Sequence, residues 1–280
     1  MNNLEAQFKT CVETGELTLP VLPTVGAEVL SLTRREDVDA SQLAKLVQND
    51  QSLSGHIMRL ANSAAYNNGG KIQTLQQAVT KLGMSQIGQM ALTVSVGESV
   101  FKSNASTDQI VNYLWKHSLA SAAWAKEIAR QLRSNTEIAF LCGLLHQIGK
   151  PVAVNTLVNI LENENEALKN HQSIVELIDK YNQLIGVNLA KRWEFPEAVI
   201  ETIDYIDEYT KAPSAKQEAM IVNAARLLAT HTLDDKSDEE LLEITNNQPV
   251  FSELNLYHED QEVLVAKSAS VRSLIESLTL

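Results

Sequence analysis

Apolar residues recur every three or four positions along most of the chain, a spacing typical of helices that bury one face. This pattern predicts an all-α fold. Segment 85–101 also fits a strand, because the β-branched residues in LTVSV lower its helix propensity. The predicted helices cover residues 25–32, 41–48, 53–64, 74–82, 85–101, 108–133, 137–146, 157–169, 174–185, 187–193, 196–206, 215–231 and 259–278.

Polar caps and glycines set the ends of several helices. Asp50 is placed to cap the helix that follows it, and Thr74 or Gln73 is placed to open the next one. Gly83 then ends that second helix. Residues 66–71, YNNGGK, predict a loop.

The polar segment 103–108, SNASTD, is the clearest internal boundary. It divides the chain into an amino-terminal helical part, residues 1–107, and a carboxy-terminal part, residues 108–280, which ends in a helical extension. One face of that extension is apolar and either packs on the body of the protein or joins two copies as a homodimer. The face consists of Val263, Leu264, Val271, Leu274, Ile275 and Leu278.

Two histidines lie on predicted inward faces of neighbouring helices. His146 ends helix 137–146, one turn beyond Gly143, and small residues such as Ala120 and Gly143 would let the two helices approach closely. Two imidazoles brought together in this way are either part of a metal site or a hydrogen-bonded pair of core residues. The buried stripe of helix 108–133 is predicted to be Ile110, Leu114, His117, Ser121, Trp124 and Ile128.

Composition favours packed helices and argues against nucleic acid as a partner. Hydrophobic residues make up 44% of the 280 residues and aromatic residues only 5%, so aliphatic side chains must fill the core. The net charge is −12, and ten acidic residues between Asp234 and Glu262 face one lysine, Lys236. Such a surface repels nucleic acid and anionic lipid. It is either a solvated face or a docking site for a basic partner.

The remaining features predict a cytoplasmic protein with no membrane partner. The start, MNNLEAQFKT, lacks the pattern of a secretory signal, and no apolar run is long enough to span a bilayer. Cys11 and Cys142 fit no metal-binding or redox spacing, and Cys142 is expected to be a small buried apolar residue.

Six motifs, in order along residues 15–230, carry a family resemblance. They are LPVLPTVGAEVL, MRLANSAAYN, KIQTLQQAVTKLGMSQI, WKHSLASA, LLHQIGK and KRWEFPEAVIETI. Together they resemble the HDOD family, a branch of the HD superfamily of metal-dependent phosphohydrolases. The resemblance implies an HD-domain-like helical bundle preceded by a packed amino-terminal helical subdomain.

The resemblance also implies that the metal site is vestigial and that no metal is bound. In HD phosphohydrolases a His, a later His-Asp pair and a distal Asp hold the metal, which lowers the pKa of a bound water. Here His117 and His146 match the two histidines, but Gln147 replaces the Asp of the pair. Asn182 stands where some relatives have a further His, and residues 206–207, Ile-Asp, stand where they have a His pair. The distal Asp would fall within IVNAARLLA, which contains no carboxylate.

Arg59, Asn62 and Ser63 form the hallmark segment of the family, RLANSAAY. Arg59 could contact a phosphate or an acidic partner. The alternative is a structural role, in which Asn62 bridges helices or caps a turn and neighbouring alanines allow close packing.

The implied function is that of a non-catalytic output or scaffold protein in bacterial signal transduction, which acts by protein–protein interaction and needs no cofactor. Two alternatives stay open. One is a metal-dependent phosphohydrolase that acts on a nucleotide or phosphoester. The other is a module that senses a cyclic dinucleotide, for which Arg59, Lys81 or Lys126 could form a local basic pocket.

Overall fold

The computed structural model describes residues 2–14, 17, 19–33, 40–63, 66, 69–163 and 171–278. Within these ranges the chain forms α-helices and one 3-10 helix, with no strand, so the predicted all-α fold is confirmed. Segment 85–101 is helical, and the strand alternative is wrong. Each helix in the described ranges is too short or too polar to span a lipid bilayer.

The helices follow one another in three groups. The first group is α1 (Asn2–Thr14), α2 (Thr24–Thr33), α3 (Ala40–Gln48), α4 (Gln51–Ala61), α5 (Leu75–Leu82) and α6 (Met84–Val100). The second is α7 (Asp108–Gln131), α8 (Thr136–Leu145), α9 (Gly149–Asn163), α10 (His171–Arg192), α11 (Glu197–Tyr205), the 3-10 helix η1 (Tyr209–Lys211) and α12 (Lys216–Leu233). The third is α13 (Asp238–Asn247), α14 (Pro249–Glu253), α15 (His258–Val265) and α16 (Ser268–Leu278).

The predicted caps form as expected. The side chain of Asp50 accepts a hydrogen bond from the backbone nitrogen of Leu53 at 3.0 Å and begins α4. Thr74 begins α5 through a reciprocal capping box with Gln77. Gly83 ends α5 with a φ of 80°, a backbone conformation that other residues rarely adopt.

Two helix boundaries predicted in the middle of the chain are wrong, and each lies near a glycine or a proline. The predicted break between helices 174–185 and 187–193 is wrong, because α10 continues through Gly186. Gly186 instead permits close packing, since an added Cβ would lie 3.0 Å from Cγ2 of Ile203. The helix predicted at 157–169 begins earlier, at Gly149, with Pro151 in its first turn where no backbone donor is needed. Its predicted end, and that of helix 53–64, lie outside the described residues.

The carboxy-terminal extension contains more helices than the sequence predicts. The single helix predicted at 259–278 is two helices, α15 and α16, and α13 and α14 precede them. Five residues of the predicted apolar face are buried, but Val263 is 58% exposed and does not belong to it. The extension packs on the body, and the indole nitrogen of Trp115 donates to the carbonyl of Leu278 at 3.0 Å.

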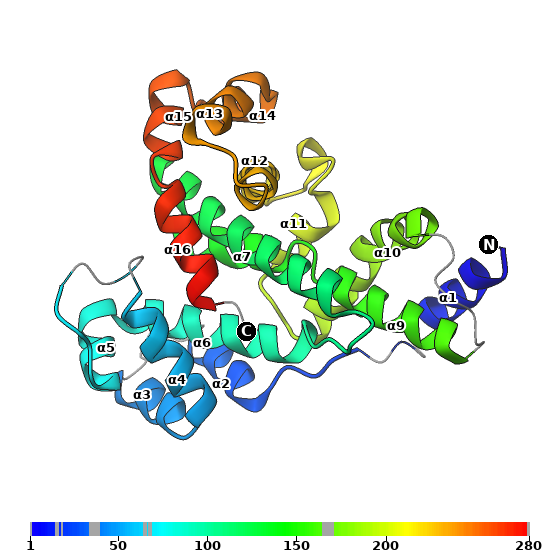
Figure 1. Ribbon diagram of the computed structural model, residues 1–280, viewed down its shortest axis with the longest axis horizontal. Helices are drawn as coiled ribbons and strands as arrows, with labels where there is room; N and C mark the ends of the chain where they lie inside the picture. Colours follow the sequence, from blue (N-terminus) through cyan, green and yellow to red (C-terminus); the bar gives the residue numbers. More distant parts are fainter. Residues whose placement is uncertain are drawn as a thin grey trace.

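The long helix α7 runs through the centre of the molecule, where α8, α12 and α16 pack against it (Figure 1). Its predicted buried stripe is confirmed from Leu114 to Ile128, while Ile110 is half-buried. Helices α2–α6 gather on one side (Figure 1), and α1 lies apart from them against α9. The Phe8 ring of α1 meets the Tyr181 ring edge-on, with centroids 5.1 Å apart. The division at residue 107 stays a prediction.

Helices α7 and α8 are in backbone contact at Gly143. A Cβ built there would lie 2.7 Å from the carbonyl oxygen of Ser121 and 2.8 Å from Cα of Ala122. Both atoms belong to the backbone of α7, so neither can move aside without shifting the helix. Cys142, next to this contact, is fully buried as expected.

We expect Gly143→Ala to lower the free energy of unfolding by about 2 kcal/mol, because overpacking outweighs the roughly 1 kcal/mol gained in helix propensity. Urea unfolding measures the change. The control is Gly55→Ala on the exposed side of α4, where an added Cβ meets nothing within 4 Å. That variant is expected to gain about 0.5–1 kcal/mol. Equal effects at the two sites would contradict the close approach of α7 and α8.

Candidate functional site

The two predicted histidines meet at the contact between α7 and α8. His117 lies on α7 and His146 directly follows α8, and their ring centroids are 5.5 Å apart. Both side chains are buried, with His117 9% and His146 4% exposed. The close approach at Gly143, one turn before His146, makes this pairing possible.

Gln147, which stands in place of an acidic ligand, points its amide nitrogen at His117. Nε2 of Gln147 lies 3.0 Å from the carbonyl oxygen of Leu114 and 3.1 Å from Nδ1 of His117. The carbonyl oxygen can only accept, so the nitrogen of the amide must face it. The same amide nitrogen therefore donates to Nδ1 of His117.

Both ring nitrogens of His117 are consequently engaged. With Nδ1 accepting, the proton resides on Nε2, which donates to Oγ1 of Thr230 at 3.0 Å. The Thr230 hydroxyl in turn donates to the backbone carbonyl of Arg226 at 3.0 Å. This chain of hydrogen bonds leaves His117 no lone pair for a metal.

His146 is held in the opposite tautomer. Its Nδ1 lies 2.7 Å from the carbonyl oxygen of Gly143, which can only accept, so Nδ1 carries the proton. Burial and the adjacent His117 lower the pKa of His146 well below its usual value. Burial and the positive charge of Lys150 lower the pKa of His117 to about 4. Both rings are therefore neutral at pH 7.

A cavity of about 570 Å³ opens beside the two histidines. It is lined by residues from α7, α9, α10 and α12 and from the ends of α8 and α11. The positions carried over from the HD pattern gather there, although they come from distant segments. The lining includes Leu114, His117, His146, Gln147, Lys150, Asp179, Asn182, Ile206, Asp207, Arg226 and Thr230.

The charged side chains of this cavity are already paired. Nζ of Lys150 lies 2.7 Å from a carboxylate oxygen of Asp179, and Arg226 lies 2.5 Å from Asp207. Each carboxylate therefore has a protein cation as its partner. Lys150 and Arg226 also raise the positive potential around the histidines, as their lowering effect on the pKa of His117 indicates.

The residues present do not fit the divalent metal that the HD pattern implies. Among the described residues, no three His, Cys, Asp or Glu side chains lie together as a ligand group. His117 offers no lone pair, and Gln147 presents an amide donor where a carboxylate would offset the charge of the ion. The nearby cations Lys150 and Arg226 would repel a metal ion.

Arg59 on α4, and Asn62 and Ser63 directly after it, lie away from this cavity. The Asn62 amide donates to the carbonyls of Met58 and Ile72 and accepts from the backbone nitrogen of Ile72, all within 2.9 Å. The Ser63 hydroxyl donates to the carbonyl of Leu60 at 2.8 Å. Asn62 thus joins the end of α4 to Ile72 and Ser63 bonds back to α4, whereas Arg59 is exposed.

Sequence reasoning missed several residues of the cavity, Asp179 among them. Lys150, Arg226 and Thr230 line it but belong to no metal-binding pattern. The spacing of Arg226 and Thr230 was an available signal, because residues four apart share one face of a helix. Their contact with α7 was not visible from that spacing.

The chain is similar to a known protein family and to a curated relative. The HDOD domain model matches residues 19–209. An uncharacterized protein of Treponema pallidum (strain Nichols) is 25% identical over 250 residues, which make up 85% of this chain and 48% of that protein. The chain therefore spans about half the length of this curated relative.

Solved structures share the fold at low sequence identity. A protein of Shewanella amazonensis, provisionally described as a metal-dependent phosphohydrolase, superposes with a TM-score of 0.74 at 22% identity, covering 99% of this chain and 98% of its own. An HDOD domain protein with unknown function from Geobacter sulfurreducens gives 0.70 at 23%, covering 98% and 95%.

A third structure is part of a longer chain. It is a protein of Marinobacter aquaeolei provisionally described as a signal transduction protein, with a TM-score of 0.69 at 22% identity, covering 94% of this chain and 60% of that one. Identities this low show the fold alone. The family match, by contrast, extends over more than half of the residues from α2 to the 3-10 helix. This chain belongs to the HDOD family.

Proposed function

We propose that this chain is a cytoplasmic, non-catalytic signalling module that acts by binding another protein. The observation that supports the proposal is the hydrogen bond from the Gln147 amide to Nδ1 of His117. It occupies with a donor the lone pair that a metal ion would need. His117, His146 and Gln147, which we call the histidine centre, then serve as an internal polar contact between α7, α8 and α12.

Electrostatics support the same conclusion. A hydrolytic centre of this superfamily needs carboxylates to offset the charge of the ion and to polarise a bound water. Asp179 and Asp207, the carboxylates in this cavity, are paired with Lys150 and Arg226. Recruiting either one for a metal would break an ion pair and leave its cation unpaired.

Two observations support a role in protein binding. One is that the fold is found within longer relatives, and the other is the exposed surface of α4. The Marinobacter and Treponema relatives are longer than this chain, so the same fold there adjoins further segments. Arg59 belongs to the family hallmark but is exposed, unlike Asn62, whose hydrogen bonds explain its presence. An exposed arginine is suited to bidentate recognition of a carboxylate on a partner.

The first test is for metal and turnover. We expect wild-type protein purified without added metal to carry far less than one equivalent of Mn, Fe, Mg or Zn by mass spectrometry. With Mn²⁺ added, hydrolysis of a chromogenic phosphodiester should not exceed that of His146→Ala. A stoichiometric metal together with turnover that His146→Ala abolishes would establish the rival function, a metal-dependent phosphohydrolase.

The second test concerns the partner surface. Wild-type protein immobilised as bait in an extract of the source cells should retain a specific protein that Arg59→Glu does not. Lys191→Glu, an equally drastic change at an exposed position of α10, is the matched control and should retain it. Circular dichroism verifies that both variants are folded. Identical capture by wild type and Arg59→Glu would remove α4 from the binding surface.

The third test treats the histidines as structural elements. The folded pKa of His117 is about 4 and its ordinary value is 6.5, so the unfolded chain takes up the proton first as the pH falls. Stability from this residue is complete above about pH 6.5 and is lost as the pH falls toward 4. We expect His117 to lower the free energy of unfolding by about 2 kcal/mol between pH 7.5 and pH 5, in addition to the loss from His146, whose pKa is also lowered.

His117→Gln should remove much of this pH dependence, because glutamine does not titrate. The control is His258→Gln, which changes a side chain that is 62% exposed and leaves the buried centre intact. Urea unfolding of each variant at pH 7.5 and pH 5 gives the change in its free energy of unfolding with pH. An unchanged pH dependence in His117→Gln would show that this imidazole is not the group responsible.

A further inference from the structure

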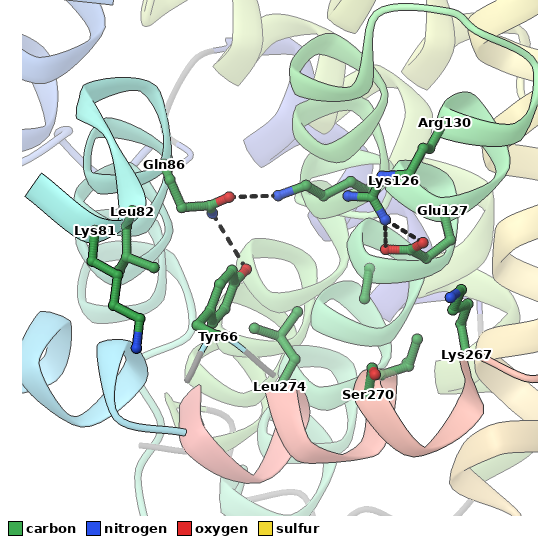
Figure 2. Close-up of a pocket in the computed structure, with 12 residues that line it drawn as sticks. Tyr66, Lys81, Leu82, Gln86, Lys126, Glu127, Arg130, Lys267, Ser270 and Leu274 are labelled. Carbon is green, nitrogen blue, oxygen red and sulfur yellow. Dashed lines mark hydrogen bonds and ion pairs between the residues drawn. The ribbon is translucent and has the colours of Figure 1, made fainter. Parts of the chain in front are cut away.

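A second cavity, of about 390 Å³, lies where α5, α6, α7 and α16 meet (Figure 2). Its walls come from three regions of the chain that are distant in sequence. The walls come from Tyr66 with the facing ends of α5 and α6, from the carboxy-terminal third of α7, and from α16 with the preceding Lys267. The lining comprises Tyr66, Lys81, Leu82, Gln86, Ala123, Lys126, Glu127, Arg130, Lys267, Ser270, Val271 and Leu274.

The lining is basic, although the protein is acidic. Four cations, Lys81, Lys126, Arg130 and Lys267, face one carboxylate, that of Glu127. The whole chain has 35 acidic and 23 basic residues, so the cavity reverses the overall balance. Glu127 is ion-paired with Arg130, as Figure 2 shows, and it also acts on the charge of Lys126. We call this space the basic cavity.

Lys126 is the most informative of these cations. Its Nζ donates to the amide oxygens of Gln86 at 2.7 Å and Gln89 at 3.1 Å, both of which are neutral acceptors. It also lies over the Tyr66 and Phe140 rings, 5.9 and 5.8 Å from their centroids. Within the described part of the chain, Lys126 forms no ion pair.

A partly buried ammonium costs free energy in the ligand-free protein, although the charges of Glu127 and Glu137 offset part of this cost. Burial lowers the pKa of Lys126 to about 8, which records the cost of holding that charge. A partly desolvated cation that lines a cavity is a candidate for binding an anion. Two of its three N–H donors are used by Gln86 and Gln89, so one remains for an acceptor in the cavity.

The other wall of the basic cavity is apolar. Leu82, Val271 and Leu274 line it beside the ring of Tyr66, and Figure 2 places Tyr66 and Leu274 next to each other. Inorganic phosphate would leave this wall uncovered. The volume falls within the range of about 300–1,000 Å³ that is usual for small-molecule sites.

We propose that the basic cavity binds a nucleotide, with its phosphate on Lys126, Arg130 and Lys267 and its base against Tyr66, Leu82 and Leu274. The evidence is independent of the histidine cavity and of the proposed protein partner. Lys126 stands nine residues after His117, which places the two on opposite faces of α7.

Such a ligand would join α16 to the amino-terminal helices. Lys267 and Ser270 belong to the carboxy-terminal wall, while Tyr66, Lys81 and Leu82 belong to the opposite one. A molecule that contacts both walls stabilises the docked position of α16, because it binds only when the walls are together. Nucleotide binding is therefore expected to protect the α16 amides from hydrogen exchange.

The test uses the full chain and isothermal titration with AMP, GMP, a cyclic dinucleotide and inorganic phosphate. We expect at least one nucleotide to bind with a Kd below about 100 μM, a typical affinity for a small ligand with several polar contacts. Inorganic phosphate should bind at least about tenfold more weakly, because it cannot cover the apolar wall. Hydrogen exchange with the bound nucleotide should slow at α16.

Lys126→Met is the decisive variant, since it keeps the length of the side chain and removes the charge. It should weaken nucleotide binding at least about tenfold, the loss expected for one charge-assisted hydrogen bond. It should not lower the unfolding midpoint. Lys191→Met on α10 is the matched control and should bind like wild type. Arg130→Gln and Lys267→Gln, at exposed positions, provide the same measurement should Lys126→Met fold poorly.

Three results would overturn the proposal. The first is the absence of binding by every nucleotide in the series. The second is nucleotide affinity that is unchanged in Lys126→Met, Arg130→Gln and Lys267→Gln. The third is binding of inorganic phosphate as tight as that of the nucleotides, which would leave the apolar wall without a role. None of these results bears on the protein-binding proposal, whose test concerns Arg59.

Discussion

The backbone contact between α7 and α8 at Gly143 is the constraint on which the histidine centre depends. A Cβ at this position would overlap the backbone of α7. With no side chain between them, the two helices come close enough for the residues after α8 to reach the face of α7 that carries His117. The His146 ring lies near that ring, tilted by 48° to it, and Gln147 reaches both the His117 ring and the carbonyl of Leu114.

Charge then decides what this arrangement can do. An aspartate at position 147 would place a carboxylate beside His117. A hard divalent metal ion needs such a charged oxygen ligand. The amide instead donates a hydrogen bond, and Lys150 and Arg226 add positive potential. The centre is therefore a neutral polar contact inside a bundle of helices, satisfied by protein groups alone around His117.

The two faces of α7 have different characters. One face carries His117 against α8 and α12, where the acidic side chains are paired with cations. The opposite face carries Lys126, a cation in contact with neutral amides and aromatic rings. Because α16 packs across this second face, occupancy of the basic cavity and the position of the carboxy-terminal helix are physically linked. A signalling role for the chain would have a structural basis in that link.

Residues close in sequence could be interpreted without the structure. Helical periodicity located most helices, and the caps at Asp50 and Thr74 were correct because each depends on atoms within three residues. The family motifs likewise indicated that His117, His146 and Gln147 belong to one site. The break predicted at Gly186 and the late start predicted for helix 157–169 have one cause, because glycine and proline fit inside helices when packing or a first-turn position suits them.

Helical periodicity, caps and motifs did not predict the contacts between segments that are distant in sequence. Oγ1 of Thr230 accepts from His117 across 113 positions, and the basic cavity joins Tyr66 to Leu274. Local propensity and spacing establish which face of a helix is apolar and where it ends. They do not specify which helix covers that face, because that choice is made by the packing of the whole core. The tautomers of the histidines, and the engagement of both ring nitrogens of His117, follow from that packing.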